Sequence, residues 1–452
     1  MKKSIAFVGL LSALAGMVPV PLLAQFTLSG QIRTRTELRD GFGSPLNEKQ
    51  EAALFTSQRT RLNVGYEGYR TKFFVAVQDV RVWGQDASTN NRITNPELNG
   101  LMLHEAWAEI GLLDTAFTKT GRALSLKIGR QELMYDDSRL LGNLDWLQQA
   151  RRHDAALLKY EKNGFTTHLG AAYNQNREAN AGQIYNGVPS GYPAGTNGIG
   201  TAYKSLQFLY LGKKWKQGTA SFLVVKDDFN RYKLDSTQAK VGQKGTWSRV
   251  TAGPYLNTKI GKNLSVTASA YWQLGKDKDG KSLNASTFSI SSAYKVHPNV
   301  TVGPGVDYLS GNAPGDTRSH RFDPLYGTPH KFWGQMDYFY VANGFGPSGL
   351  VNYYLKSIFT LTKKLTGTAD YHVFQSPNEV RVGDKPLTNK SFGSEFDLIL
   401  NYKMLPAVGV QLGYAHYFST SSLAAVKGVS NPRQGANWAY LMINVTPQFL
   451  SK

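Results

Sequence analysis

The sequence predicts an all-β protein, a transmembrane antiparallel β-barrel of about 18 strands with short periplasmic turns and long extracellular loops. Three observations predict it: a strand pattern with one apolar and one charged face, the recurrence of that pattern to the end of the chain, and an alternation of long and short connections. No apolar run after residue 24 is long enough to form a membrane-spanning helix.

The two-faced strand pattern is clearest in residues 26–39. Apolar and small side chains occupy the even positions, whereas the odd positions include Arg33, Arg35, Glu37 and Arg39. A period of two residues indicates an extended strand. In a membrane barrel the apolar face of such a strand meets lipid and its charged face lines the lumen.

Residues 1–24 have the features of a secretory signal peptide. Lys2 and Lys3 give a positive start, an apolar run follows, and cleavage is expected after Ala24. The alternative is a membrane-anchoring helix. Residues 25–452 contain no linker or low-complexity run and are expected to form a single barrel domain, and the absence of cysteine excludes a lipoprotein anchor.

The other strands are expected wherever the same alternation returns. A bulge is expected near Gln78, where the alternation is mixed. The expected ranges are 56–66, 72–83, 103–110, 123–133, 154–161, 165–174, 203–213, 219–226, 247–257, 264–274, 285–296, 300–309, 350–361, 365–374, 392–402, 408–418 and 437–445. The last strand must pair with the first, because an open edge in lipid would leave backbone groups unpaired.

The connections between these strands alternate in length. Long connections are expected at 40–55, 84–102, 135–153, 175–202, 227–246, 311–349, 375–391 and 419–436, and short ones at 67–70, 162–164, 215–218, 259–263, 297–299, 362–364 and 404–407. Residues 112–122 and 275–284 are intermediate. This alternation favours a membrane barrel over the alternative, a soluble sandwich.

Aromatic residues support the same topology. Girdles at the two membrane interfaces are expected from Tyr66, Tyr160, Phe165 and Tyr402 beside short turns, and from Trp83, Tyr173, Trp272, Phe418 and Trp438 beside long loops. Residues 311–349, the longest connection, are too aromatic for a freely solvated loop and are expected to pack into the barrel mouth. The alternative is a loop folded on a surface cluster of its own.

The lumen is expected to be rich in arginine. Strand parity predicts that Gln31, Arg33, Arg35, Arg39, Arg59, Arg61 and Asn63 face inward, joined by Arg81 and Arg130. Inward carboxylates are expected at Glu37, Asp307, Asp370, Glu395 and Asp397. Arginine suits anion transport because its charge is permanent and its planar fork matches a carboxylate. The alternative is that these arginines and carboxylates form structural salt bridges that fill the barrel.

The net charge of +19 admits an anionic solute, lipopolysaccharide or nucleic acid as partner. Nucleic acid is not expected, since the chain carries an export signal and no nucleic-acid-binding motif. No catalytic motif is present, and we expect no enzyme activity, no metal site and no cofactor. The alternative functions to an anion-conducting pore are those of a barrel enzyme and of a structural barrel or adhesin.

Residues 127–155 include Gly129-Arg130-Gln131-Glu132, Arg139-Leu140-Leu141-Gly142, Asp145-Trp146, and Arg152 with Asp154. This segment, residues 29–42 and residues 321–339 resemble the alginate export family. The resemblance implies a monomeric barrel in the outer membrane of a Gram-negative bacterium that passes an anionic polysaccharide. It implies pore arginines at Arg33, Arg35, Arg59, Arg61, Arg130 and Arg152. A pore for small organic anions, and uptake rather than export, remain open alternatives.

Overall fold

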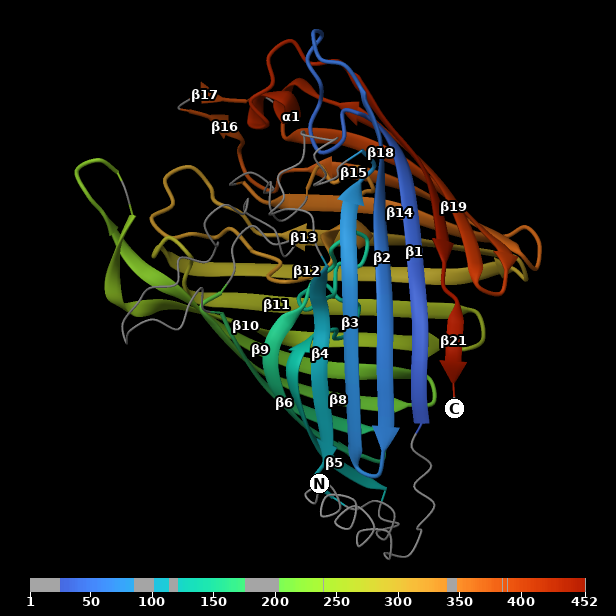
Figure 1. The fold of residues 1–452 in the computed structure, drawn as a ribbon. Coiled ribbons are helices and arrows are strands. Elements are labelled where there is room, and N and C mark those ends of the chain that lie inside the picture. The colour runs from blue at the N-terminus through green and yellow to red at the C-terminus, as the bar shows by residue number, and fades with distance from the viewer. Residues whose placement is uncertain are drawn as a thin grey trace, which may run out of the picture.

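The computed structural model describes residues 25–84, 101–113, 121–174, 203–238, 240–339, 348–383, 385–387 and 389–451. Within them β1 to β15 and β18 to β20, eighteen strands, pair in sequence order and β20 pairs with β1, which closes an antiparallel barrel. In Figure 1, β1 to β3 run across β11 to β14 behind them, as expected for tilted strands on opposite walls of a barrel. The predicted fold class is confirmed.

The strands lie close to the predicted ranges. They are β1 (Gln25–Asp40), β2 (Ala53–Gly68), β3 (Thr71–Val82), β4 (Met102–Gly111), β5 (Arg122–Gln131), β6 (His153–Lys162), β7 (Phe165–Tyr173), β8 (Ser205–Trp215), β9 (Gly218–Leu234), β10 (Lys240–Ile260), β11 (Leu264–Lys276), β12 (Ser282–His297), β13 (Val300–Leu309), β14 (Leu350–Thr360), β15 (Leu365–Gln375), β18 (Ser391–Leu405), β19 (Val408–Ser419) and β20 (Gly435–Val445). After β20, β21 (Gln448–Ser451) also pairs with β1. The remaining elements are the hairpin β16 (Arg381–Val382) and β17 (Lys385–Pro386), helix α1 (Ser421–Val426) and a 3-10 turn (Pro329–Lys331).

The last strand shows the two faces of the wall. Leu441 and Ile443 are exposed, as lipid-facing residues of an isolated barrel are, whereas Trp438 and Tyr440 are buried on the inner face. Trp438 was expected in the outer aromatic girdle, and that prediction is wrong because its parity turns it inward. The other aromatic residues predicted beside the long loops, among them Trp83 and Trp272, are exposed.

Short turns gather at one end of the barrel and long loops at the other, which we call the turn end and the loop end. Two predicted connections at the loop end are shorter than expected. β9 and β10 continue past the wall, pair up to Leu234 and Lys240, and stack Tyr232 on Trp247 at 4.9 Å between ring centroids. The turn between β11 and β12 comprises only residues 277–281.

The bulge expected near Gln78 lies on the neighbouring strand. β3 pairs with β4 at Ala76–Glu105 and then at Val77–Leu103, so His104 of β4 is the extra residue. β3 itself stays regular.

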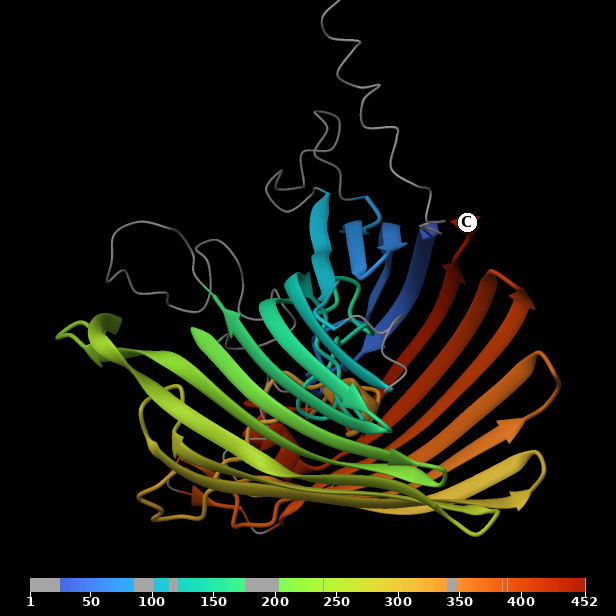
Figure 2. The same cartoon turned by 90° about the horizontal axis from the view of Figure 1, so that it is seen from below.

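Two loops fold back into the barrel at its loop end. The inner loops, residues 132–152 and the described parts of 310–349 (310–339 and 348–349), bury Leu141, Tyr326 and Trp333 against strand residues that face inward. Leu141 forms a β-bridge with Tyr326, so the two loops also hold each other. In Figure 2 the teal segment that follows β5 lies inside the curve of the sheet. The prediction that 311–349 packs into the mouth is confirmed for its described residues.

Among the described residues, no helix is long and apolar enough to span a membrane. The signal peptide predicted at residues 1–24 lies outside the described part of the chain.

Candidate functional site

The arginines of β1 and β2 lie side by side on the inner wall. The two strands pair so that Arg33 stands opposite Arg59 and Gln31 opposite Arg61, and cross-strand partners point to the same side of a sheet. Arg33 is 5% and Arg59 1% exposed, whereas Ile32 on the opposite face is 48% exposed. These arginines therefore face inward, as predicted.

A carboxylate from the 132–152 inner loop bridges the two facing arginines. Nη1 of Arg33 donates to Oδ2 of Asp145 at 3.0 Å, and Nη1 of Arg59 donates to Oδ1 at 2.8 Å. Gln148 of the same loop accepts from Nε of Arg33 at 3.0 Å. We call this arrangement the arginine clamp: two guanidinium groups from adjacent strands holding one carboxylate.

The carboxylate in the clamp is stable as an anion. Burial alone would raise the pKa of Asp145, but the neighbouring Arg59 and Arg33 outweigh it and hold that pKa below its ordinary value of 3.8. Because 43% of the Asp145 side chain remains exposed, solvent can reach the carboxylate that the clamp holds.

Arg35 contacts the backbone and an aromatic side chain of the same loop. Its Nη1 donates to the carbonyl oxygen of Trp146 at 2.8 Å, and its guanidinium carbon lies 4.0 Å from the centroid of the Trp146 ring. Its Nε donates to Glu37 at 2.8 Å, and Glu37 also accepts from Arg39. Glu37 is the one predicted counter-charge that pairs with arginines of β1.

Arg61 binds a neutral partner. Its Nε and Nη2 both donate to Oε1 of Gln78, at 3.0 and 2.7 Å, and Gln78 in turn donates to the carbonyl of Gln149 in the 132–152 loop. Asn63, further along β2, donates to Ser29 at 3.2 Å on the same inner face. Hydrogen-bond donors of β1, β2 and β3 thus hold the loop against the inner wall.

The prediction that Arg81 faces the lumen is wrong. Arg81 stands opposite Gln58, which neighbours the inward-facing Arg59 along β2 and therefore points outward. A bulge at Gln78 would have turned Arg81 inward, but β3 has no extra residue. Arg81 instead pairs with Asp79 at 2.6 Å on the outer face.

The prediction that Arg130 faces the lumen is also wrong, because strand parity places Arg130 on the outer face of β5. Arg130 has the parity of Ile128, which is 42% exposed, and it forms two parallel hydrogen bonds of 2.8 and 2.9 Å with Asp154 at the loop end of the outer face. Arg152, the other arginine implied by the resemblance, ends the 132–152 loop. One of its Nη atoms is buried and has no hydrogen-bond partner among the residues that the structure describes.

The remaining predicted counter-charges face inward but bind other groups. Asp307 accepts from Nη1 of Arg139 at 3.0 Å, and Asp370 lies 3.4 Å from the ammonium of Lys356. Glu395 and Asp397 are 0% and 2% exposed. These carboxylates do not supply the partners of Arg33 and Arg59.

Glu395 holds the 310–349 inner loop. Its Oε1 accepts from the backbone N–H of Met336 at 2.7 Å. The two inner loops are joined by Arg151, whose Nη1 donates to the carbonyls of Tyr326 and Gly327, and by the Tyr326 N–H, which donates to Leu140 at 2.9 Å. Movement of one inner loop is therefore coupled to the other.

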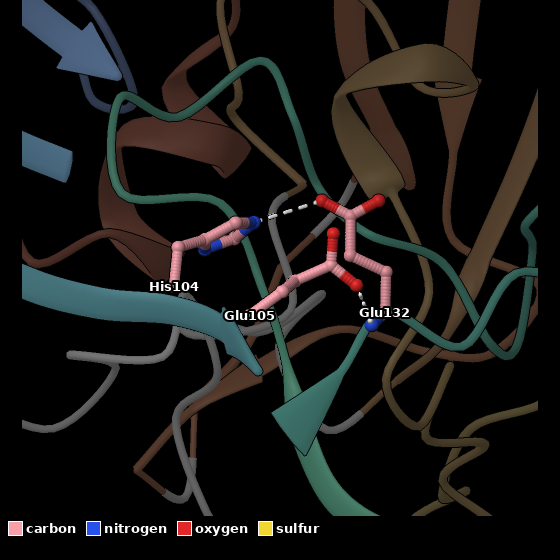
Figure 3. A group of neighbouring side chains, drawn as sticks. All are labelled: His104, Glu105 and Glu132. Carbon is pink, nitrogen blue, oxygen red and sulfur yellow. Dashed lines mark hydrogen bonds and ion pairs between the residues drawn. The ribbon is translucent and has the colours of Figure 1, made fainter. Parts of the chain in front are cut away.

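His104, Glu105 and Glu132 form a further group at the start of the 132–152 loop (Figure 3), with ligand atoms within 4.8 Å of one another. The bulge at His104 and the positive φ of Gly129, where a Cβ would lie 2.3 Å from the Ala106 oxygen, bring these side chains together. The donor set has metal-ligand chemistry. However, Oε1 of Glu132 already binds His104 at 2.9 Å, and within the described part of the chain the buried Nδ1 of His104 has no hydrogen-bond partner that would orient the ring as a ligand.

We assign this group as the anchor of the 132–152 loop. Glu132 also accepts from Nδ2 of Asn143 at 2.8 Å, and its backbone N–H donates to Glu105 at 3.0 Å. The two contacts tie the loop's first residue to its middle and to β4.

Sequence reasoning missed Asp145, Gln148, Arg139 and Arg151, the loop residues that contact the inner wall and the second inner loop. Strand parity carries no information about loops. The only available signal was the motif-rich segment 127–155, which contains all four.

Comparison with known proteins gives one family and a set of similar structures. Residues 24–437 match the family model described as alginate export. Among curated proteins there is no significant match.

Three of the similar solved structures are from Pseudomonas aeruginosa. OpdQ is 15% identical with a TM-score of 0.56, covering 94% of this chain and 98% of that one. OccK3 (OpdO) is 14% identical with a TM-score of 0.58, covering 94% and 96%. OpdK, solved with vanillate, is 11% identical with a TM-score of 0.56, covering 94% and 99%. At these identities the likeness shows a shared fold.

Proposed function

Because the chain belongs to the alginate export family and is an outer-membrane channel of a Gram-negative bacterium, we propose that it conducts anions and that its main solute is an anionic, uronate-type polysaccharide. The turn end then faces the periplasm and the loop end faces outward.

The observation that carries the proposal is the arginine clamp. Its two guanidinium groups hold one carboxylate through charge-assisted hydrogen bonds of 2.8 and 3.0 Å. The carboxylate of Asp145 stands where a carboxylate of a solute would bind. A uronate chain offers one such group per sugar and can replace Asp145 when the 132–152 loop moves aside.

Transport by this route needs weak sites rather than one strong site, because each must release what it binds. Asp145 keeps the clamp weak, since an incoming carboxylate must compete with a carboxylate already in place. Arg35 and Arg61 lie next to the clamp on the same wall and offer the next contacts for the carboxylates of the solute.

A pore for small organic anions is the second candidate. Both inner loops occupy the barrel at its loop end, which favours a narrow passage. OpdK, which shares the fold, was crystallised with vanillate, a small carboxylate. Export and uptake are compatible with either solute.

We assign the chain no catalytic role. Each chain closes its own barrel through β1 and β20, so a pore needs no partner subunit and we propose that it acts as a monomer. Basic residues in the loops suit contact with lipopolysaccharide phosphates.

Permeation into proteoliposomes tests the proposal. Swelling rates are compared for glucuronate, glucose and glucosamine, which have similar size and differ in charge. We expect glucuronate to enter fastest and glucosamine slowest, with the difference reduced at high salt, where charges are screened. Equal rates for the three solutes would contradict an anion pathway.

A further inference from the structure

A cavity of about 470 Å³ opens at the turn end of the inner wall, between β15, β18, β19 and β20. This volume falls within the range of about 300–1,000 Å³ that is usual for ligand sites. Three lysines lie at its rim, Lys363, Lys364 and Lys403, and none of its lining residues is acidic. We call it the periplasmic basin.

The three lysines come from neighbouring segments that hold each other. Lys363 and Lys364 belong to the turn between β14 and β15, and the backbone N–H of Lys403 in β18 donates to the carbonyl of Lys364 at 2.8 Å. Within the described residues none of the three ammonium groups forms an ion pair, unlike Lys356 on the same wall, which meets Asp370. Their positive potential is therefore available to an anion.

The wall of the basin is lined with amides. Asn401 and Gln411 are cross-strand partners, and Nε2 of Gln411 donates to Oδ1 of Asn401 at 2.6 Å. Tyr440 donates to Oε1 of Gln411 at 2.7 Å, which fixes the orientation of that amide. The Nδ2 group of Asn401 has no hydrogen-bond partner among the described residues and is available to a ligand. Amide groups of this kind hydrogen-bond sugar hydroxyls, whereas ammonium groups attract carboxylates.

The basin is continuous with the arginine clamp. Asn444, which lines the basin, accepts from Nε2 of Gln31 at 2.8 Å, and Oε1 of Gln31 accepts from Nε of Arg59 at 3.0 Å. Asn444 is also the cross-strand partner of Arg33. A row of polar groups thus leads from the lysines to the clamp along one side of the barrel.

We propose that the periplasmic basin is a binding site for a carboxylated saccharide on the periplasmic side of the channel. The lysines bind uronate carboxylates and the amides bind hydroxyl groups of the same chain. The inference rests on the proposed function, and it adds a first site where the solute docks before it reaches the clamp.

Single-channel recording tests this site. A galacturonate hexasaccharide is added to the turn side or the loop side of bilayers with known insertion, and its dissociation constant is taken from the current blocks. The Lys363→Gln/Lys403→Gln double variant should bind the probe from the turn side roughly three- to tenfold more weakly, as expected for two exposed ionic contacts. Lys363→Glu/Lys403→Glu should weaken it further.

Lys259→Gln/Lys262→Gln, at the turn between β10 and β11, is the matched control and should bind as the parent does. Equal binding by the parent and the Lys363/Lys403 variants would overturn the basin as a site. Equally strong block by neutral maltohexaose would overturn its carboxylate chemistry. A parent that prefers potassium over chloride would instead contradict the proposed function, so the two failures are distinguishable.

Discussion

At the scale of single residues, Asp145 decides whether the arginine clamp is occupied or free. Asp145 neutralises one of the two guanidinium charges and leaves the other available to neutralise the charge of an anionic solute. Both arginines are almost fully buried, so without an anionic partner they would bear the cost of burial uncompensated. The side chain of Asp145 is partly exposed, which limits the strength of the contact.

Replacing Asp145 by asparagine keeps the shape and removes the charge. We expect the docking of the 132–152 loop to weaken by at most about 1.5–3 kcal/mol, as for hydrogen bonds to charged groups. The channel should become more selective for chloride and noisier in single-channel records. Asp154→Asn, which affects the outer pair with Arg130, is the control and should leave selectivity unchanged.

Acidification should not reproduce this effect. The pKa of Asp145 is held below its ordinary value of 3.8, so the contact is fully present above that value and is lost only as the pH falls through the lowered pKa. Records at about pH 7 and about pH 5 should therefore show the same contribution from the clamp. A noise increase at pH 5 that is absent in Asp145→Asn would show that this aspartate titrates there.

At the scale of elements, the inner loops lie inside the barrel at its loop end, where they would narrow the passage. The 310–349 loop is held at Glu395, Leu140 and Arg151, and its aromatic residues pack inside the wall. Its ends touch, since a Cβ on Gly311 would lie 2.0 Å from the backbone nitrogen of Gly349. The loop can therefore be removed without stretching the barrel.

Deleting residues 312–347 should raise single-channel conductance, because the deletion removes side chains from the interior. Deleting residues 236–238 from the exposed turn between β9 and β10 is the control and should leave conductance unchanged. If a folded variant without 312–347 conducts like the parent, this loop does not narrow the pathway.

The strands of this barrel can be predicted from the sequence, whereas the contacts of its inner loops cannot. Strand ranges and inward positions such as Arg33 and Arg59 follow from a period of two, since one face must meet lipid. Arg81 has the parity of Trp83, which was expected in the outer girdle and is exposed, so the regular alternation of β3 already placed Arg81 on the outer face. Asp145 was out of reach because its partners are about 110 and 90 residues away in sequence, and only the folded loop brings them together.

At the scale of the whole molecule, the alternation of turns and loops assigns each end of the barrel to one side of the membrane. The chain contains no cysteine, so single introduced thiols report without background. Ala313→Cys and Lys278→Cys at the loop end should react with an impermeant thiol reagent on intact cells. Lys216→Cys and Lys262→Cys at the turn end should react only after lysis, and their labelling on intact cells would reverse the topology.

The closed wall, the inner loops and the basic groups on one side of the interior support the proposed anion pathway. Its selectivity should be strongest at low salt, where the fields of the arginines and lysines reach furthest. Among the described residues Arg61 hydrogen-bonds only the neutral Gln78, and it lies beside the clamp. Neutralising Arg61 should therefore reduce that selectivity without removing a partner from a carboxylate.

The reversal potential of the purified parent channel in a potassium chloride gradient distinguishes an anion pathway from a purely structural role of the arginines. We expect it to lie towards the chloride equilibrium potential, to move closer to it at low ionic strength, and to move back in Arg61→Gln. A reversal potential on the potassium side would contradict an anion pathway and leave the arginines as structural anchors of the 132–152 loop.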